Sequence, residues 1–342
     1  SFYILFDFFK TYKQLKFIQN LYFQKFILNI NDRRFITELC YGVVRNYYFI
    51  KHQLLSYCKN NDKIDKKSLS LLLIGAYQID YMNSVPTYAA ISTTVNIAKK
   101  ECSYSAGFIN AILRRFSIGK IDTKKLHIRY SYKKWMFDLL IKDFGLKNAK
   151  LIAKQQILKP SHWIRINKKI DYVKQIFKKN NLNYISHVDL GNYLKVESIN
   201  NKYIHLLIEK GYIYIQSPSS GLVLKLIKLK NNDSFIDACA APGGKISSIC
   251  LSTNKDNNII AYEINSKRYN KLKSNLNNMS IKNAKLVNDD FLNCKSKNID
   301  TILLDVPCSG TGTINKNPDI KIRRREKEYH YLNNQQYELL NH

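Results

Sequence analysis

The spacing of hydrophobic residues predicts helices throughout residues 1–120. One helix face carries apolar residues four positions apart, and Asp32 in front of them is the expected N-cap. These apolar residues are Phe35, Leu39, Val43 and Tyr47. Leu71–Tyr81 is expected to form a nearly continuous apolar helix, and Pro86 stands where a first helical turn tolerates proline. With Ala106–Phe116, these segments predict an all-helical domain.

Residues 121–230 have a different pattern. A basic connector is expected to contain two helices, Trp135–Leu140 and Lys147–Leu158. Beyond it, short helices alternate with strands that carry Arg and Tyr side chains, a combination that suits a nucleic-acid-binding surface. The expected strands are Trp163–Ile166, Tyr193–Val196 and Tyr212–Ile215. We expect this small α+β subdomain either to bind RNA or to serve as a structural adaptor between two larger domains.

In residues 231–342, strands and helices alternate, which predicts an α/β Rossmann-like core. The expected strands are Ser234–Ala238, Asn258–Tyr262, Ala284–Asn288 and Thr301–Leu304. One helix is expected to end at Leu251, and the next to cover Ser266–Met279. A parallel sheet wrapped by helices binds its ligand at the carboxyl ends of the strands.

The loop after the first of these strands is built of small residues. It runs through Cys239, Ala240, Ala241, Pro242, Gly243, Gly244 and Lys245. Because glycine has no Cβ, a ligand can approach the backbone N–H groups at the following helix N-terminus closely. On the glycine pair alone, an ordinary tight turn between strand and helix is an equal alternative to a cofactor loop.

Acidic residues follow the later strands. Glu263 lies 18 residues past Lys245, where a carboxylate can hold ribose hydroxyl groups. Asp289 and Asp290 follow the third strand, and Asp305 follows the fourth. Because the carboxyl ends of parallel strands meet at one edge of a sheet, these acids predict a shared cofactor pocket.

Charge separates the chain into a basic front and a balanced back. The 55 Lys and Arg residues exceed the 26 Asp and Glu residues, giving a net charge of +29. Counted by segment, the excess is +10 in residues 1–120, +15 in 121–230 and +4 in 231–342. A polyanion held by the first two segments would explain this distribution, and a general bias toward lysine and asparagine is the alternative.

The cysteine and hydropathy patterns exclude several classes. The seven cysteines form no Cys-x-x-Cys pair and no Cys/His cluster, which argues against a disulfide framework and a metal site. Free cysteines are typical of a reducing cytoplasm. No apolar run reaches the roughly 18 residues that span a bilayer. We therefore expect a cytoplasmic monomer without a metal and without a membrane partner.

Two motifs resemble those of RNA cytosine-C5 methyltransferases: Asp237–Lys245 looks like their AdoMet-binding motif, and Asp305–Gly310 looks like their Pro-Cys motif. Four earlier segments resemble the NusB-like domain of the bacterial Sun/Fmu (RsmB) type, which modifies small-subunit (16S) ribosomal RNA. These segments are residues 32–35, 38–45, 75–78 and 108–115. The resemblance covers nearly the whole chain and implies a ribosomal RNA partner, met before subunit assembly is complete.

The resemblance also implies roles for single residues. Residues 239–245 would line the methionine and carboxylate end of the cofactor, S-adenosyl-L-methionine (AdoMet). Glu263 would bind its ribose, and Asp290 would lie beside the adenine. Asp305 would lie near the cofactor amine and the target base.

Two of the matching positions depart from the family pattern. Asp290 stands where the family has its acid before a small residue, but Phe291 replaces that residue, so Asp289 remains an alternative at the adenine. Ser217 follows Gln216 where the family often has an acid.

The implied chemistry depends on cysteine. A thiolate adds to carbon 6 of cytosine, and carbon 5 then becomes nucleophilic enough to take a methyl group. In the family, a later Thr-Cys motif supplies this thiolate, and the Pro-Cys cysteine assists its release. DNA cytosine methyltransferases instead attack with the Pro-Cys cysteine. Cys308 is thus expected to be catalytic, with release as the favoured role.

No Thr-Cys pair follows Cys308 in the 342 residues, and the sequence ends at His342. We expect the last strands of the core and the main nucleophile to lie beyond His342. These 342 residues alone would then bind AdoMet weakly and would not turn over.

Two other functions stay open. A methyltransferase of the same class could act on transfer RNA, although the NusB-like front disfavours this. A non-catalytic RNA-binding adaptor of the NusB type would need no cofactor pocket, and the acids after three strands argue against it.

Overall fold

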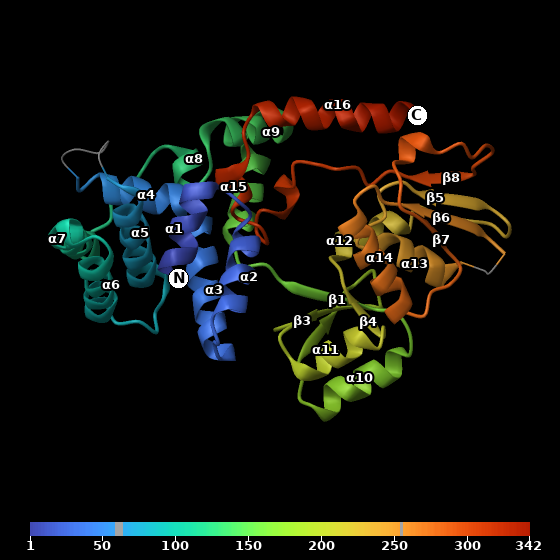
Figure 1. The fold of residues 1–342 in the computed structure, drawn as a ribbon, viewed down its shortest axis with the longest axis horizontal. Helices are drawn as coiled ribbons and strands as arrows, with labels where there is room; N and C mark the ends of the chain where they lie inside the picture. Colours follow the sequence, from blue (N-terminus) through green and yellow to red (C-terminus); the bar gives the residue numbers. More distant parts are fainter. Residues whose placement is uncertain (59–63, 254–255) are drawn as a thin grey trace. The chain divides into compact units, whose positions relative to one another are not determined.

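The computed structural model describes residues 1–58, 64–253 and 256–342, which form two compact units (Figure 1). The first unit contains Ser1–Pro160 together with Ser309–Tyr329. The second contains Ser161–Cys308 together with His330–His342. The predicted middle segment, residues 121–230, is therefore divided between the two units at residue 160.

The first unit is helical, as predicted. Its helices are α1 (Phe2–Thr11), α2 (Leu15–Lys25), α3 (Ile30–Arg45), α4 (Tyr47–Leu55), α5 (Lys66–Tyr81), α6 (Thr87–Glu101), α7 (Ala106–Ile118), α8 (Leu126–Arg129) and α9 (Lys134–Ile157), with the short turn η2 (Ser103–Ser105). Helix α5 is buried from Ser70 to Gln78 and contacts α1, α3, α4, α6 and α7. Its continuous apolar sequence follows from this central position, because nearly every face meets another helix.

Three local predictions in this unit were wrong in detail. The N-cap of α3 is Asn29, whose side chain accepts a hydrogen bond of 2.8 Å from the Asp32 backbone N–H, so Asp32 lies in the first turn. Tyr47 does not share a helix face with Val43, because α3 ends at Arg45, before Asn46, and Tyr47 begins α4. Pro86 is the N-cap of α6 and precedes its first turn.

Gly145 divides α9 into the two helices expected from the sequence. Its φ of 73° and ψ of 160° lie outside the helical region, and the positive φ is one that glycine adopts without strain. The sequence on each side of Gly145 therefore predicts a helix of its own. In the structure, the two helices follow each other directly and are separated only by the non-helical backbone of Gly145.

The first unit also holds a late segment of the chain, with η4 (Thr311–Thr313) and α15 (Ile320–Arg323). The Lys321 side chain is fully buried, and its Nζ donates a hydrogen bond of 2.7 Å to the Arg45 carbonyl. The ammonium lies 5.0 Å from the Tyr132 ring centroid. Burial holds the pKa of Lys321 well below its ordinary value. These contacts join the segment to the helical unit at its core.

The second unit begins with an antiparallel sheet in the order β2-β3-β1-β4. The strands are β1 (His162–Ile166), β2 (Tyr184–Ser186), β3 (Tyr193–Val196) and β4 (Ile213–Ile215), with helices α10 (Ile170–Lys179) and α11 (Lys202–Glu209). The predicted α+β subdomain is confirmed. Strand β2 is not among the predicted strands.

A parallel sheet follows in the order β7-β6-β5-β8 (Figure 1). Its strands are β5 (Ser234–Asp237), β6 (Asn258–Tyr262), β7 (Lys285–Val287) and β8 (Thr301–Leu303). The associated helices are α12 (Pro218–Leu224), α13 (Gly244–Ser252), α14 (Ser266–Asn278), η3 (Phe291–Asn293) and α16 (Lys327–Asn341). The predicted Rossmann-like core is confirmed.

Two apolar clusters cover this parallel sheet. One joins Phe235 and Ile259 to helices α13 and α14, and the other joins Ile236 and Ile260 to Phe291 and to Leu339 of α16. Successive residues of one strand thus enter different clusters, as the period of two in a strand requires. The strand ends are held between these clusters, and the candidate site is built there.

Candidate cofactor and catalytic site

The loop between β5 and α13 needs glycine at two successive positions. Gly243 is the N-cap of α13 and has a φ of 103°, a conformation that residues with a Cβ rarely adopt. At Gly244, a Cβ would lie 3.0 Å from Cε1 of Tyr214 and 3.2 Å from Nε2 of Gln216. The first glycine serves the turn, and the second allows β4 and its following residue to approach α13.

A buried arginine fixes the beginning of α13. Arg165 of β1 is 1% exposed, and its Nη1 donates hydrogen bonds to the Gly244 carbonyl (2.7 Å) and to Gln216 Oε1 (2.8 Å). Its Nη2 donates to Ser247 Oγ at 2.7 Å, and its guanidinium lies 5.6 Å from the Tyr214 ring centroid. Burial lowers the pKa of Arg165. The positive charge is thus held by neutral oxygens of Gln216 and of Gly244 and Ser247 at the start of α13.

Sequence reasoning had assigned the Arg of this strand to an RNA-binding surface, and its burial contradicts that assignment. Gln216 was noted only as part of a motif. Its Oε1 also accepts a hydrogen bond of 2.7 Å from the Tyr193 hydroxyl, so it connects two strands to Arg165. The sequence signal available was weak: Arg165 lies among buried alternating strand residues, where an unpaired charge would be costly.

Lys245 and Asp305 meet at the ends of two neighbouring strands. The Lys245 ammonium forms an ion pair with Asp305 Oδ2, although the residues are 60 positions apart. Strand β8, which precedes Asp305, pairs directly with β5, which precedes the glycine loop. The predicted neighbourhood of these two side chains follows from this pairing. Cys308, three residues after Asp305, is exposed.

A cavity of about 160 Å³ lies at the carboxyl ends of the parallel strands. It brings together three residues predicted to bind the cofactor: Cys239, Glu263 and Asp290. Its other lining residues are Ala238, Ile264, Arg268, Phe291, Leu292 and Pro307, with Gln335, Glu338 and Leu339 from α16. Asp289, residues 240–245 and Asp305 do not line this cavity.

Glu263 is the most distinctive residue of the cavity, because it is a carboxylate only 2% exposed. Its Oε1 accepts a hydrogen bond of 3.0 Å from the Asn265 backbone N–H. Its Oε2 has no hydrogen-bond donor in the part of the chain that the structure describes, although Arg268 Nη2 lies 3.4 Å away. A buried carboxylate oxygen without a donor is unusual in a folded protein, and it suits a ligand that brings hydroxyl groups.

Asp237, the last residue of β5, received no role from the sequence. It is 1% exposed, and burial raises the pKa of its carboxyl to about 7. The Cys239 backbone N–H donates to Asp237 Oδ1 at 3.3 Å, which opposes this rise. Burial also raises the pKa of the Cys239 thiol to about 11, so Cys239 carries a neutral thiol at pH 7. Cys239 is therefore no thiolate nucleophile at that pH.

Among the described helices, none is long and apolar enough to cross a membrane. Within residues 1–58, 64–253 and 256–342, no group of three or more His, Cys, Asp and Glu side chains is placed to hold a metal ion.

Two known protein families match separate parts of the chain. Residues 224–342 match the family described as 16S rRNA methyltransferase RsmB/F, and residues 2–117 match the NusB family. These two matches place a segment similar to the NusB family before a segment similar to the RsmB/F methyltransferases. The resemblance seen in the sequence motifs is thereby confirmed. The family assignment also confirms AdoMet as the cofactor.

Two relatives match most of the chain. The probable ribosomal RNA small subunit methyltransferase B of Coxiella burnetii is 29% identical, and the match covers 92% of this chain and 76% of the relative. The ribosomal RNA small subunit methyltransferase B of Proteus mirabilis is also 29% identical, over 90% of this chain and 75% of the relative.

Solved structures show the same fold at low identity. The protein PH0851 superimposes with a TM-score of 0.77 at 19% identity, covering 96% of this chain and 78% of its own. NSun6 from Pyrococcus horikoshii, solved with SFG, gives a TM-score of 0.54 at 19% identity. That match covers 62% of this chain and 79% of NSun6.

Proposed function

We propose that this protein transfers a methyl group from AdoMet to carbon 5 of a cytosine in small-subunit (16S) ribosomal RNA, through a covalent cysteine adduct. The names of the relatives support this RNA as substrate. The observation on which the proposal chiefly depends is the cavity, lined also by Pro307, in which Glu263 Oε2 is ion-paired with Arg268 but accepts no hydrogen bond from the described residues. Pro307 immediately precedes Cys308, so a methyl donor and a thiol would lie in neighbouring positions.

The proposed cofactor contacts divide between the cavity and the glycine loop. Glu263 Oε2 accepts a ribose hydroxyl group, and Asp290 lies beside the adenine. The N-terminus of α13, preceded by Gly243, offers backbone N–H groups to the cofactor carboxylate. Asp305, held by Lys245, lies near the cofactor amine and the target base. The cofactor itself supplies an electrophilic methyl group on a sulfonium.

In the proposed reaction, a thiolate first adds to the cytosine ring and is later eliminated from it. The thiolate sulfur forms a bond to carbon 6 of cytosine, and the displaced electron pair makes carbon 5 attack the methyl group. Carbon 5 then loses its proton, and the bond between sulfur and carbon 6 breaks to restore the ring and the thiolate. Cys308 assists this release. Its exposure leaves it accessible to an RNA base.

Replacing the Cys308 thiol tests this mechanism. The protein, expressed from its complete gene, is incubated with AdoMet and 16S ribosomal RNA, and covalent protein–RNA complexes are resolved on a denaturing gel. We expect Cys308→Ser to accumulate such a complex and to release little methylated RNA. Cys58→Ser, the same chemical change in the helical unit, should behave as the wild type. Normal turnover by Cys308→Ser would contradict the role of Cys308, and loss of the complex with intact RNA binding would make Cys308 the attacking group.

A further inference from the structure

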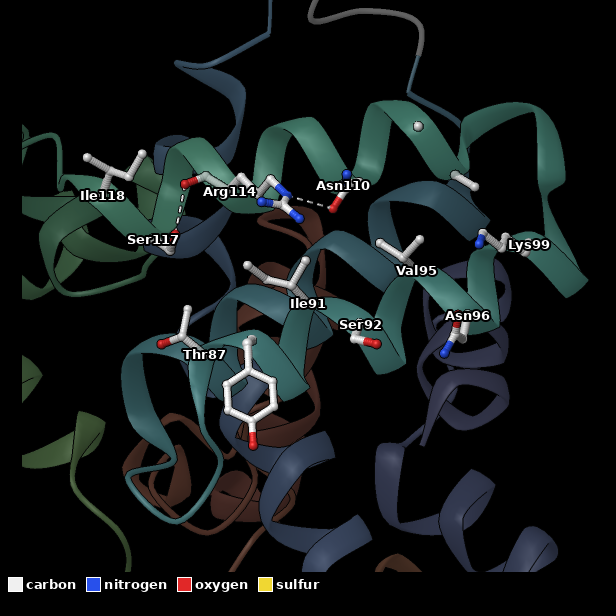
Figure 2. A pocket seen from close by; sticks show the side chains of 13 residues that line it. Thr87, Ile91, Ser92, Val95, Asn96, Lys99, Asn110, Arg114, Ser117 and Ile118 are labelled. Atoms are coloured by element: carbon white, nitrogen blue, oxygen red, sulfur yellow. Dashed lines mark hydrogen bonds between the residues drawn. The ribbon is translucent and has the colours of Figure 1, made fainter.

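The helical unit contains a second concave surface. It is lined by residues between Thr87 and Ile118, whereas the cofactor cavity is lined by residues between Ala238 and Leu339. Helices α6 and α7 enclose a groove of about 800 Å³ (Figure 2). Ile91 and Val95 of α6 form its apolar part, and Asn110 and Arg114 extend from α7 on the opposite side. Nothing in the proposed methyl transfer uses this groove.

The groove is positively charged. Among the residues that the structure describes, its lining includes Lys99 and Arg114 and no acidic side chain. Arg114 Nε donates a hydrogen bond of 3.2 Å to Asn110 Oδ1, which orients the guanidinium plane within the groove. The nearby acid at the end of α6, Glu101, already forms an ion pair with Lys67 at 3.8 Å. An anionic ligand would therefore meet cations whose charge no carboxylate of the lining offsets.

The remaining lining side chains suit bases better than a protein surface or a duplex. Tyr88 is 77% exposed, so its ring offers a face on which a base can stack. Asn96 offers both an amide donor and a carbonyl acceptor, and Asn110, whose Oδ1 already accepts from Arg114, offers its amide donor; these groups read exposed base edges. Paired bases in a duplex keep those faces and edges covered. Cations, a free aromatic ring and amides together match an unpaired polynucleotide strand.

We propose that the groove between α6 and α7 binds a single-stranded segment of the RNA substrate. Lys99 and Arg114 contact phosphates, and Tyr88 stacks on a base. The identity of the RNA depends on the proposed function, whereas the binding itself requires neither cofactor nor catalysis. A failure of methyl transfer can therefore be distinguished from a failure of this inference.

Two neighbouring pairs of residues provide matched controls. On α7, Arg114 lines the groove and the neighbouring exposed Arg115 does not. On α6, Lys99 lines the groove and the neighbouring exposed Lys100 does not. Fluorescence anisotropy with a labelled oligouridylate of about 12 nucleotides, without AdoMet, measures the affinity at several salt concentrations. We expect Arg114→Gln and Lys99→Gln each to reduce the slope of log affinity against log salt by about 1. Arg115→Gln and Lys100→Gln should retain the wild-type slope.

The aromatic contact has its own control. Tyr88→Ala should weaken binding roughly fivefold or more, because a lost stack removes about 1–3 kcal/mol per base, and Tyr88→Phe should restore it. Equal losses within each matched pair would overturn the inference, because they would show general electrostatic attraction only. Unchanged binding in all groove variants would also overturn the inference and would favour a protein as the partner of the groove. Tighter binding of the corresponding duplex would overturn the single-strand assignment.

Discussion

At the scale of single residues, Glu263 has the environment that most needs a ligand. This carboxylate is only 2% exposed, and its Oε2, although 3.4 Å from the Arg268 cation, accepts no hydrogen bond from the described residues, which is costly for a buried carboxylate. Glu263→Gln removes the charge and one acceptor while nearly preserving the shape. Because a hydrogen bond to a charged group contributes about 1.5–3 kcal/mol, we expect AdoMet affinity to fall by at least about tenfold. Isothermal titration calorimetry measures this change.

The control for this prediction is another carboxylate of the same cavity. Glu338 also lines it but is exposed on α16, so water already satisfies its oxygens. Glu338→Gln should change the affinity much less than Glu263→Gln. Equal effects of the two substitutions would show that Glu263 acts only through its charge and would remove the assigned ribose contact.

Asp237 predicts a pH dependence of stability. Its pKa is about 7 in the folded protein against an ordinary value of 3.8, so between these values the folded state holds a proton that the unfolded chain has lost. The contribution of Asp237 to the free energy of unfolding therefore falls as pH rises, by at most about 1.4 kcal/mol per pH unit. Urea unfolding from pH 4.5 to 8 should show Asp237→Asn becoming progressively more stable than the wild type up to pH 7. A constant difference across this range would refute the raised pKa.

Residue positions were easier to predict than residue surroundings. The strand pattern placed Glu263, Asp290 and Asp305 at the correct sheet edge, because each directly follows a strand or its first loop residues. It did not indicate that Glu263 would have an oxygen without a donor, or that Arg165 would bind Gly244. Such facts depend on side chains from distant elements, which periodicity along the chain does not record.

At the scale of elements, the antiparallel sheet supports the cofactor loop through Arg165. Arg165→Lys keeps the charge but cannot reproduce the two-nitrogen fork that reaches Gly244, Gln216 and Ser247. The acceptors left without donors should lower the free energy of unfolding by about 3 kcal/mol. We also expect weaker AdoMet binding, because the first turn of α13 loses its anchor.

A variant of the same sheet separates positioning from general stability. Leu194 of β3 is fully buried, and Leu194→Ala should cost about 2–5 kcal/mol without touching α13. AdoMet binding is measured by calorimetry at a temperature where both variants remain folded. Weakened binding in Arg165→Lys alone would confirm the positioning role, and equal binding in both variants would exclude it.

Element boundaries show where local patterns were sufficient. The strands β3 and β6 have the predicted bounds, because both are short apolar runs between turn-forming residues. The beginning of α3 was misplaced because both Asn29 and Asp32 can cap a helix, and only the hydrogen bond from the Asp32 N–H to Asn29 identifies the cap. Capping residues that lie one turn apart cannot be ranked by type alone.

At the scale of the whole molecule, the assignment of residues 309–329 could not be predicted. The alternation of strands and helices suggested one continuous core over residues 231–342, yet this segment belongs to the helical unit. The hydrogen bond from Lys321 to Arg45 joins residues 276 positions apart. A buried lysine with a carbonyl partner has no signature in the sequence, because lysine is normally exposed.

The net charge of +29, concentrated in residues 1–230, supports an RNA partner. Methylation of a specific cytosine in ribosomal RNA remains the central claim. Bisulfite sequencing of 16S ribosomal RNA from strains with and without the gene tests it most directly. We predict one cytosine that resists conversion in the wild type, converts in the deletion strain, and regains resistance when the gene is restored. Identical conversion at every cytosine of this RNA in both strains would contradict the proposed function.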